Sequence, residues 1–155
     1  VVWTGGDATL DRFGSIDWTH KKFLATGTHD FMHTLMNVVL GTWDEDKWII
    51  AICEFLALVV LASISAERWA NRIVFYVTDN TVVKSWVNRR RARHPLGRHL
   101  IRLLEKLESQ SGCTITCLYI RTYHNELPDD LSRESIEFIR GDSRMEGYQE
   151  LKPPE

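Results

Sequence analysis

Apolar residues recur along the chain in two spacings, which together predict a mixed α/β fold. Short segments of the strand type, bounded by turn residues, lie at 1–7, 13–18, 21–26, 72–78 and 114–120. Apolar residues at helical spacing predict helices over 50–66, from residue 82 onward, over 95–112 and near 128–140. In the third of these, Pro95 suits the first helical position and Gly112 suits the end. Residues 27–47 fit either a strand or a helix.

The order of these segments predicts how they join. Three strands separated by short turns favour an antiparallel meander, and the later strand–helix–strand units favour right-handed parallel crossovers. The expected architecture is therefore an α/β fold with a five-stranded mixed sheet flanked by helices, formed by one domain over residues 1–140. Residues 141–155 lack an apolar pattern, so we expect a flexible tail there.

A carboxylate interrupts the most apolar segment of the chain. Residues 48–69 read WIIAICEFLALVVLASISAERW, and Glu54 lies among them. Burying an ionised carboxylate without a partner is expensive, so Glu54 needs either a partner or access to water. The apolar part, 49–65, is at the short limit for a membrane span and contains this charge. A buried helix is therefore expected, with no membrane association.

Bulk composition narrows the class of protein further. The 155 residues are 44% hydrophobic and 26% charged, as in ordinary globular proteins. Because the formal net charge is −2, any binding of nucleic acid must depend on local charge. The three cysteines are odd in number and have no C-x-x-C spacing, which fits buried thiols in a reducing compartment. An intracellular location, cytoplasmic or nuclear, is expected.

Acidic residues fall where several chain segments meet one edge of the predicted sheet. Asp7 ends the first strand, Asp79 ends the fourth, and Glu54 lies in the first turns of the helix before the fourth strand. Asp129 and Asp130 open the last helix. Singly, each aspartate also fits a turn or a helix N-cap. Together the acids would repel one another unless a divalent cation neutralised them, and an all-oxygen ligand set suits Mg²⁺ or Mn²⁺.

Four short motifs surround these acids. The first is DATLDRFG at 7–14, and the second is CEFLAL at 53–58. The others are TDNTVVKSWV at 78–87 and NELPDDLSR at 125–133. Together they resemble the motifs of ribonuclease H domains in retroelement reverse transcriptases, in the same order and over residues 1 to about 134. Arg12 replaces a glycine of the family pattern, and Pro128 replaces an alanine.

The resemblance implies a function and a set of site residues. Members of the family cut the RNA strand of an RNA/DNA hybrid with two Mg²⁺ ions, and Mn²⁺ is the expected substitute. A reverse transcriptase domain is the expected upstream partner. The implied catalytic and metal-binding residues are Asp7, Glu54, Asp79 and Asp129, with Asp130 as the alternative to Asp129. His124 is implied as a catalytic aid in proton transfer or product release, and otherwise is a plain loop residue.

Basic and amide side chains suggest where nucleic acid would bind. The segment NRRRARHPLGR, residues 88–98, fits either a solvated loop or a phosphate-binding patch, because arginine forks suit phosphate oxygens. Asn80 and Asn125 are candidates for hydrogen bonds on the minor-groove side of a hybrid. The arginines expected to contact phosphates are Arg89, Arg90, Arg91, Arg93, Arg98 and Arg121.

Two other classes of function fit parts of the pattern. A catalytically retired domain of the same fold would dock nucleic acid or protein, although it would have no reason to keep acids that repel. An integrase-like or resolvase-like nuclease is the other alternative. The helix that carries Glu54 before the fourth strand argues against integrases, whose last carboxylate lies late in the chain.

Overall fold

The computed structural model describes residues 1–27, 46–121, 126–134 and 136–152. Its strands are β1 (Val2–Ala8), β2 (Arg12–Asp17), β3 (Lys22–Gly27), β4 (Ile73–Thr78), β5 (Thr114–Tyr119) and β6 (Gln149–Glu150). Its helices are α2 (Asp46–Ser65), α3 (Thr81–Arg89), α4 (Pro95–Ser111), α5 (Glu126–Arg133), α6 (Ile136–Arg140) and the short 3-10 helix η2 (Ser143–Met145).

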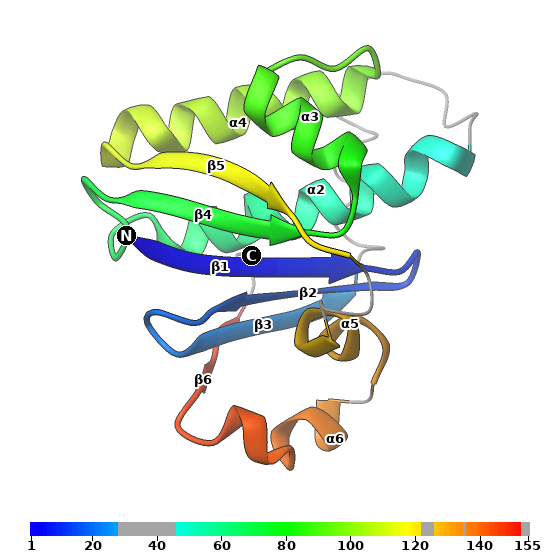
Figure 1. Ribbon diagram of the computed structural model, residues 1–155, viewed down its shortest axis with the longest axis vertical. Coiled ribbons are helices and arrows are strands. Elements are labelled where there is room, and N and C mark those ends of the chain that lie inside the picture. The colour runs from blue at the N-terminus through cyan, green and yellow to red at the C-terminus, as the bar shows by residue number, and fades with distance from the viewer. Residues whose placement is uncertain (28–45, 122–125, 135, 153–155) are drawn as a thin grey trace.

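The strands form one mixed sheet in the order β5-β4-β1-β2-β3-β6 (Figure 1). β1, β2 and β3 pair as an antiparallel meander, while β1, β4 and β5 run parallel, so the predicted α/β fold with a mixed sheet is confirmed. Gly5 of β1 pairs with Val77 of β4. Asp7 and Asp79 each lie two residues further on, so the two acids leave adjacent strands at the same edge of the sheet.

Three details differ from the sequence prediction. The sheet has a sixth strand, β6, within the segment expected to be a flexible tail. It has no apolar alternation and is held by backbone bonds, Gln149 N to Lys21 O at 2.9 Å and Leu151 N to Phe23 O at 2.7 Å. The single helix expected near 128–140 is two helices, α5 and α6. Because α2 begins at residue 46, Glu54 lies in its third turn and not in its first turns.

Helix α2 is apolar on all sides because both of its faces are covered. Every residue from 51 to 62 is buried. Strands β1 and β2 contact the helix where it faces the sheet, and α4 and α3 pack against it elsewhere; Figure 1 shows these neighbouring elements. A helix that is hydrophobic all round is expected in such a layer. Among the described residues, no helix combines the length and apolarity that a membrane span requires.

Polar contacts fix α2 along its own axis. The Ser15 hydroxyl of β2 donates to the carbonyl oxygen of Ala57 at 2.7 Å. Beyond the end of the helix, the Trp69 indole N–H donates to the fully buried carboxylate of Asp17 at 2.9 Å. Asp17 also accepts a hydrogen bond from the His20 backbone N–H at 3.0 Å. Since Glu54 lies one turn before Ala57, these contacts also set the position of its carboxylate.

Helix α5 covers the opposite face of the sheet, over β1, β2 and β3. Its Leu131 is fully buried and packs in a cluster with Ile16 and Phe23. The helix lies directly on Gly14 of β2, where an added Cβ would come within 2.3 Å of the Leu131 Cβ and 2.8 Å of its backbone carbonyl carbon. The absence of a side chain at Gly14 is therefore what lets α5, and with it Asp129, approach the sheet.

The first prediction concerns this contact. Gly14→Ala should lower the free energy of unfolding by about 1–3 kcal/mol, because the new methyl group meets helix backbone that cannot rotate away. Urea unfolding measures the effect. Gly27→Ala is the matched control, since the nearest atom to its added Cβ is the Asp11 carbonyl oxygen at 3.7 Å. Equal stability of the two variants would contradict the close packing of α5.

Candidate metal centre

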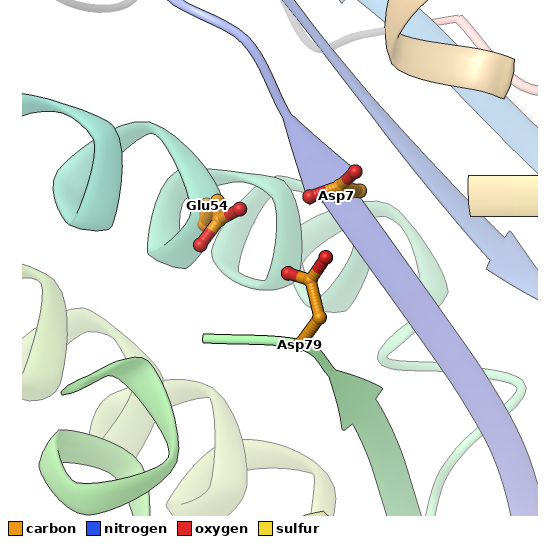
Figure 2. A group of neighbouring side chains, drawn as sticks. All are labelled: Asp7, Glu54 and Asp79. Atoms are coloured by element: carbon orange, nitrogen blue, oxygen red, sulfur yellow. The ribbon is translucent and has the colours of Figure 1, made fainter. Parts of the chain in front are cut away.

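Three carboxylates from three different elements converge at the edge of the sheet. Asp7 comes from β1, Glu54 from α2, and Asp79 from the turn after β4, and Figure 2 shows all three pointing toward one another. One oxygen from each lies within 4.8 Å of the others. Asp7 is 4% exposed and Glu54 is 6% exposed, so the cluster is largely withdrawn from water. Such an arrangement is costly unless the charges are neutralised.

In the turn after β4, Asn80 caps helix α3. The Asp79 carboxylate is therefore not used as the cap and points into the acidic cluster. Asn80 is the N-cap of α3, and its side-chain oxygen accepts from Val82 N at 2.9 Å and Val83 N at 3.1 Å. The alternative interpretation of Asp79 as the cap therefore does not hold. Asn80 also lies close enough to Glu54 to lower the pKa of that carboxyl. In this structure it joins the start of α3 to the acidic cluster.

Burial and mutual repulsion make the cluster bind protons when no cation is present. Burial is the main cause that raises the pKa of Asp7, and hydrogen bonds with Glu54 and Asp129 and the charge of Asp79 raise it further. Burial also raises the pKa of Glu54, while hydrogen bonds from Asp7 and Asn80 partly oppose that rise. Asp7 therefore holds a proton in the metal-free cluster and donates it to its neighbours.

The donor set fits a divalent cation. The Oε2 atom of Glu54 is buried and has no hydrogen-bond partner in the part of the chain that the structure describes. An acceptor left in this state is a ready ligand for a cation, because coordination would supply the missing interaction. All three side chains offer carboxylate oxygens, the ligands that Mg²⁺ and Mn²⁺ prefer.

The structure distinguishes the two aspartates of α5. Asp129 lies close enough to Asp7 to raise the pKa of that carboxyl, whereas the carboxylate of Asp130 forms an ion pair with Arg144 at 2.6 Å. Asp129 therefore faces the cluster, and Asp130 faces the segment around η2. The sequence analysis missed Arg133, whose Nε lies 2.7 Å from Asp129 Oδ1. The sequence feature that could have indicated this ion pair is the i, i+4 spacing of Asp129 and Arg133 on a helix.

A basic groove of about 980 Å³ lies along α3, the following segment and α4. Its wall includes Thr81, two residues beyond Asp79, so the groove starts beside the acidic cluster. Arg90 lies in the same wall, but its guanidinium pairs with Glu108 at 2.5 Å and donates to Ile115 O at 3.2 Å. The other arginines predicted from this segment also line the groove: Arg89, Arg91, Arg93 and Arg98.

The remaining predicted site residues lie after β5. Arg121 is exposed and follows the strand by two residues. Since Tyr119, the last residue of β5, pairs with Thr78, Arg121 is at the same edge of the sheet as Asp79. His124 and Asn125 lie outside the described residues, and their predicted roles stay predictions.

Comparison with solved structures places this architecture among known folds. The RNase H1 of Halobacterium salinarum shares 13% identity with a TM-score of 0.59, over 88% of this chain and 98% of that chain. The N-terminal RNase H domain of a Mycobacterium tuberculosis protein shares 14% identity with a TM-score of 0.56, over 90% and 97%. LC11-RNase H1, solved in complex with an RNA/DNA hybrid, shares 12% identity with a TM-score of 0.60, over 90% and 97%.

These likenesses show the fold. The sequence itself matches no family model and no curated protein. The chain is a domain with the RNase H-like fold, as the four sequence motifs predicted.

The second prediction concerns the protons held by the cluster. Asp7 has a pKa above its unfolded value of 3.8, so its protonation favours the folded state below that value, and this stability is lost as pH rises toward the raised pKa. The metal-free protein should therefore have a lower free energy of unfolding at about pH 8 than at about pH 5. Urea unfolding in the presence of a chelator measures this slope.

Asp7→Asn is the matched variant, because it keeps the shape of the side chain and removes its ionisation. Its stability should depend less on pH over the same range. A wild-type stability that stays constant or increases with pH would show that Asp7 does not carry the proton.

Proposed function

We propose that this domain is a metal-dependent endoribonuclease that hydrolyses the RNA strand of RNA/DNA hybrids, with Mg²⁺ as the metal and Mn²⁺ as a substitute. The observation that carries the proposal is the convergence of Asp7, Glu54 and Asp79 within 4.8 Å on an RNase H-like fold. Asp7 and Glu54 are buried, Asp79 is partly buried, and the unpartnered Glu54 oxygen adds to a set of ligands that suits the binding of cations.

Four acids would hold two metal ions in this proposal: Asp7, Glu54, Asp79 and Asp129. Two divalent cations so held would lower the pKa of an attacking water and would neutralise the leaving oxygen of a phosphodiester. Asn80 favours the charged form of Glu54 by lowering its pKa, and Ser15 and Asp17 hold the helix behind it. The apolar burial of α2 keeps bulk water away from the rear of the site.

The choice of a hybrid as substrate has two supports. LC11-RNase H1, which shares the fold, was solved with an RNA/DNA hybrid bound. The groove that starts beside Asp79 carries arginines, whose planar forks suit phosphate oxygens and bind without reading sequence. A groove of this kind gives a protein of net charge −2 a local surface for a polyanion.

The sequence resemblance supplies the proposed setting. Its motifs are those of retroelement polyproteins, so we assign the domain to residues 1–140 of this chain, downstream of a reverse transcriptase domain. The same setting implies that the domain acts inside the cell, in the cytoplasm or the nucleus. His124 and Asn125 remain candidates for proton transfer and substrate contact in the loop before α5.

The third prediction tests catalysis directly. Wild-type protein with Mg²⁺ or Mn²⁺ should cut RNA annealed to DNA and leave single-stranded RNA intact, and Asp79→Asn should reduce cutting to background. Millimolar Mn²⁺ should also raise the melting temperature of the wild type, because a ligand of the native state stabilises it. An intact hybrid together with an unchanged melting temperature would instead support the catalytically retired docking module.

The fourth prediction tests the groove. The double variant Arg89→Ala, Arg91→Ala should bind hybrid more weakly, and the slope of log K against log salt should fall by about 1–2 as phosphate contacts are lost. Fluorescence anisotropy with Ca²⁺ in place of Mg²⁺ measures binding without cleavage. Arg140→Ala is the control, because Arg140 pairs with Glu150 on α6 and β6, away from the groove. Equal salt slopes for all three proteins would exclude the groove as a phosphate site.

A further inference from the structure

An arginine forms an ion pair with Asp129, the fourth acid of the candidate metal centre. Arg133 Nε donates to Asp129 Oδ1 at 2.7 Å, one helical turn along α5. The Arg133 side chain is 61% exposed and the Asp129 side chain is 27% exposed, so the pair lies at the open side of the site. The charges of Asp7 and Asp79 also act on Arg133 and raise its pKa, after the larger contribution of Asp129 itself. Arg133 therefore lies within electrostatic range of the acidic cluster, while its direct ion pair is with Asp129.

Asp129 is thus shared between two partners. It lies beside Asp7 of the cluster, whose pKa it raises, and it forms an ion pair with Arg133 on its other side. The three acids whose oxygens meet within 4.8 Å are Asp7, Glu54 and Asp79, and Asp129 is not one of them. The carboxylate of Asp129 consequently lies beside the cluster, but it is paired with the guanidinium of Arg133.

We propose that Arg133 is a positioning residue that competes with the divalent metal for Asp129, so that loading of the centre exchanges the ion pair for metal coordination. The inference rests on the proposed function and adds a control over its metal dependence. An exposed ion pair is a suitable device for exchange, because solvent screens it and it breaks easily. A buried pair in the same place would hold Asp129 permanently.

The competition has two consequences of opposite sign. In the metal-free protein, the guanidinium offsets the mutual repulsion of the carboxylates, so its removal should lower the melting temperature. Toward a divalent cation the guanidinium is a like charge and a rival for a ligand, so its removal should increase metal affinity. An ion pair with a purely structural role would not give this combination, because its loss would loosen α5 and weaken both properties.

The experiment uses Arg133→Gln in the whole chain, with Mn²⁺ alone as the probe. Isothermal titration calorimetry at low salt should give a Kd about threefold to tenfold lower than that of the wild type, and the chelated protein should melt at a lower temperature. Arg133→Lys keeps the charge and should stay close to the wild type in both measurements. Arg140→Gln, which breaks an exposed ion pair with Glu150, should leave the Kd unchanged.

A double-mutant cycle assigns the effect to Asp129. In an Asp129→Asn background, Arg133→Gln should have a much smaller effect on the Kd for Mn²⁺. The change in Kd should be about a third or less of the change that the same substitution causes in the wild type. An unchanged or higher Kd for Arg133→Gln, beside normal binding by the wild type, would overturn this inference alone. Failure of the wild type to bind Mn²⁺ would overturn the proposed function and this inference with it.

Discussion

The repulsion among three clustered carboxylates, two of them buried, is the constraint on which the rest of this structure depends. Asp7 and Glu54 are almost fully withdrawn from water, and Asp79 adds a third charge within 4.8 Å. A cluster like this opposes folding unless protons or cations neutralise it. The protein must therefore hold the three acids by contacts elsewhere that are strong enough to resist their separation.

Those contacts are of two kinds. Apolar burial holds α2 against β1 and β2 and against the helices α4 and α3, which explains why the segment around Glu54 is hydrophobic on every side. Directed hydrogen bonds then set its position along the sheet, through Ser15 on one flank and Asp17 with Trp69 at the far end. On the other face, the missing side chain of Gly14 sets how near α5 comes. Contacts that lie away from the acidic cluster therefore offset the free energy needed to hold the three carboxylates together.

Much of this arrangement could be predicted from the sequence, because strand-end acids and helical spacing are local signals. The order of the elements, Pro95 at the start of α4 and Gly112 at its end all follow from such signals. β6 could not be predicted, because a strand of two residues is too short to have an apolar side-chain pattern. The choice between Asp129 and Asp130 depends on the rotation of α5 about its axis. Neighbouring residues point about 100° apart on a helix, and spacing within a motif does not say which one faces inward.

Helix α3 links the acidic cluster to the basic groove. Its first turn begins at Asn80, beside Asp79, and its positive end therefore points at the carboxylates and favours their charged forms. Its last turn lies about 13 Å away at 1.5 Å per residue, where Arg89 begins the arginine-rich wall. Asn88 fixes this end by bonding both the N–H and the C=O of Cys117 in β5. A rigid helix held at both ends keeps the acidic cluster and the basic groove at a set distance, so in the proposed function a strand bound in the groove would approach the acids in one register.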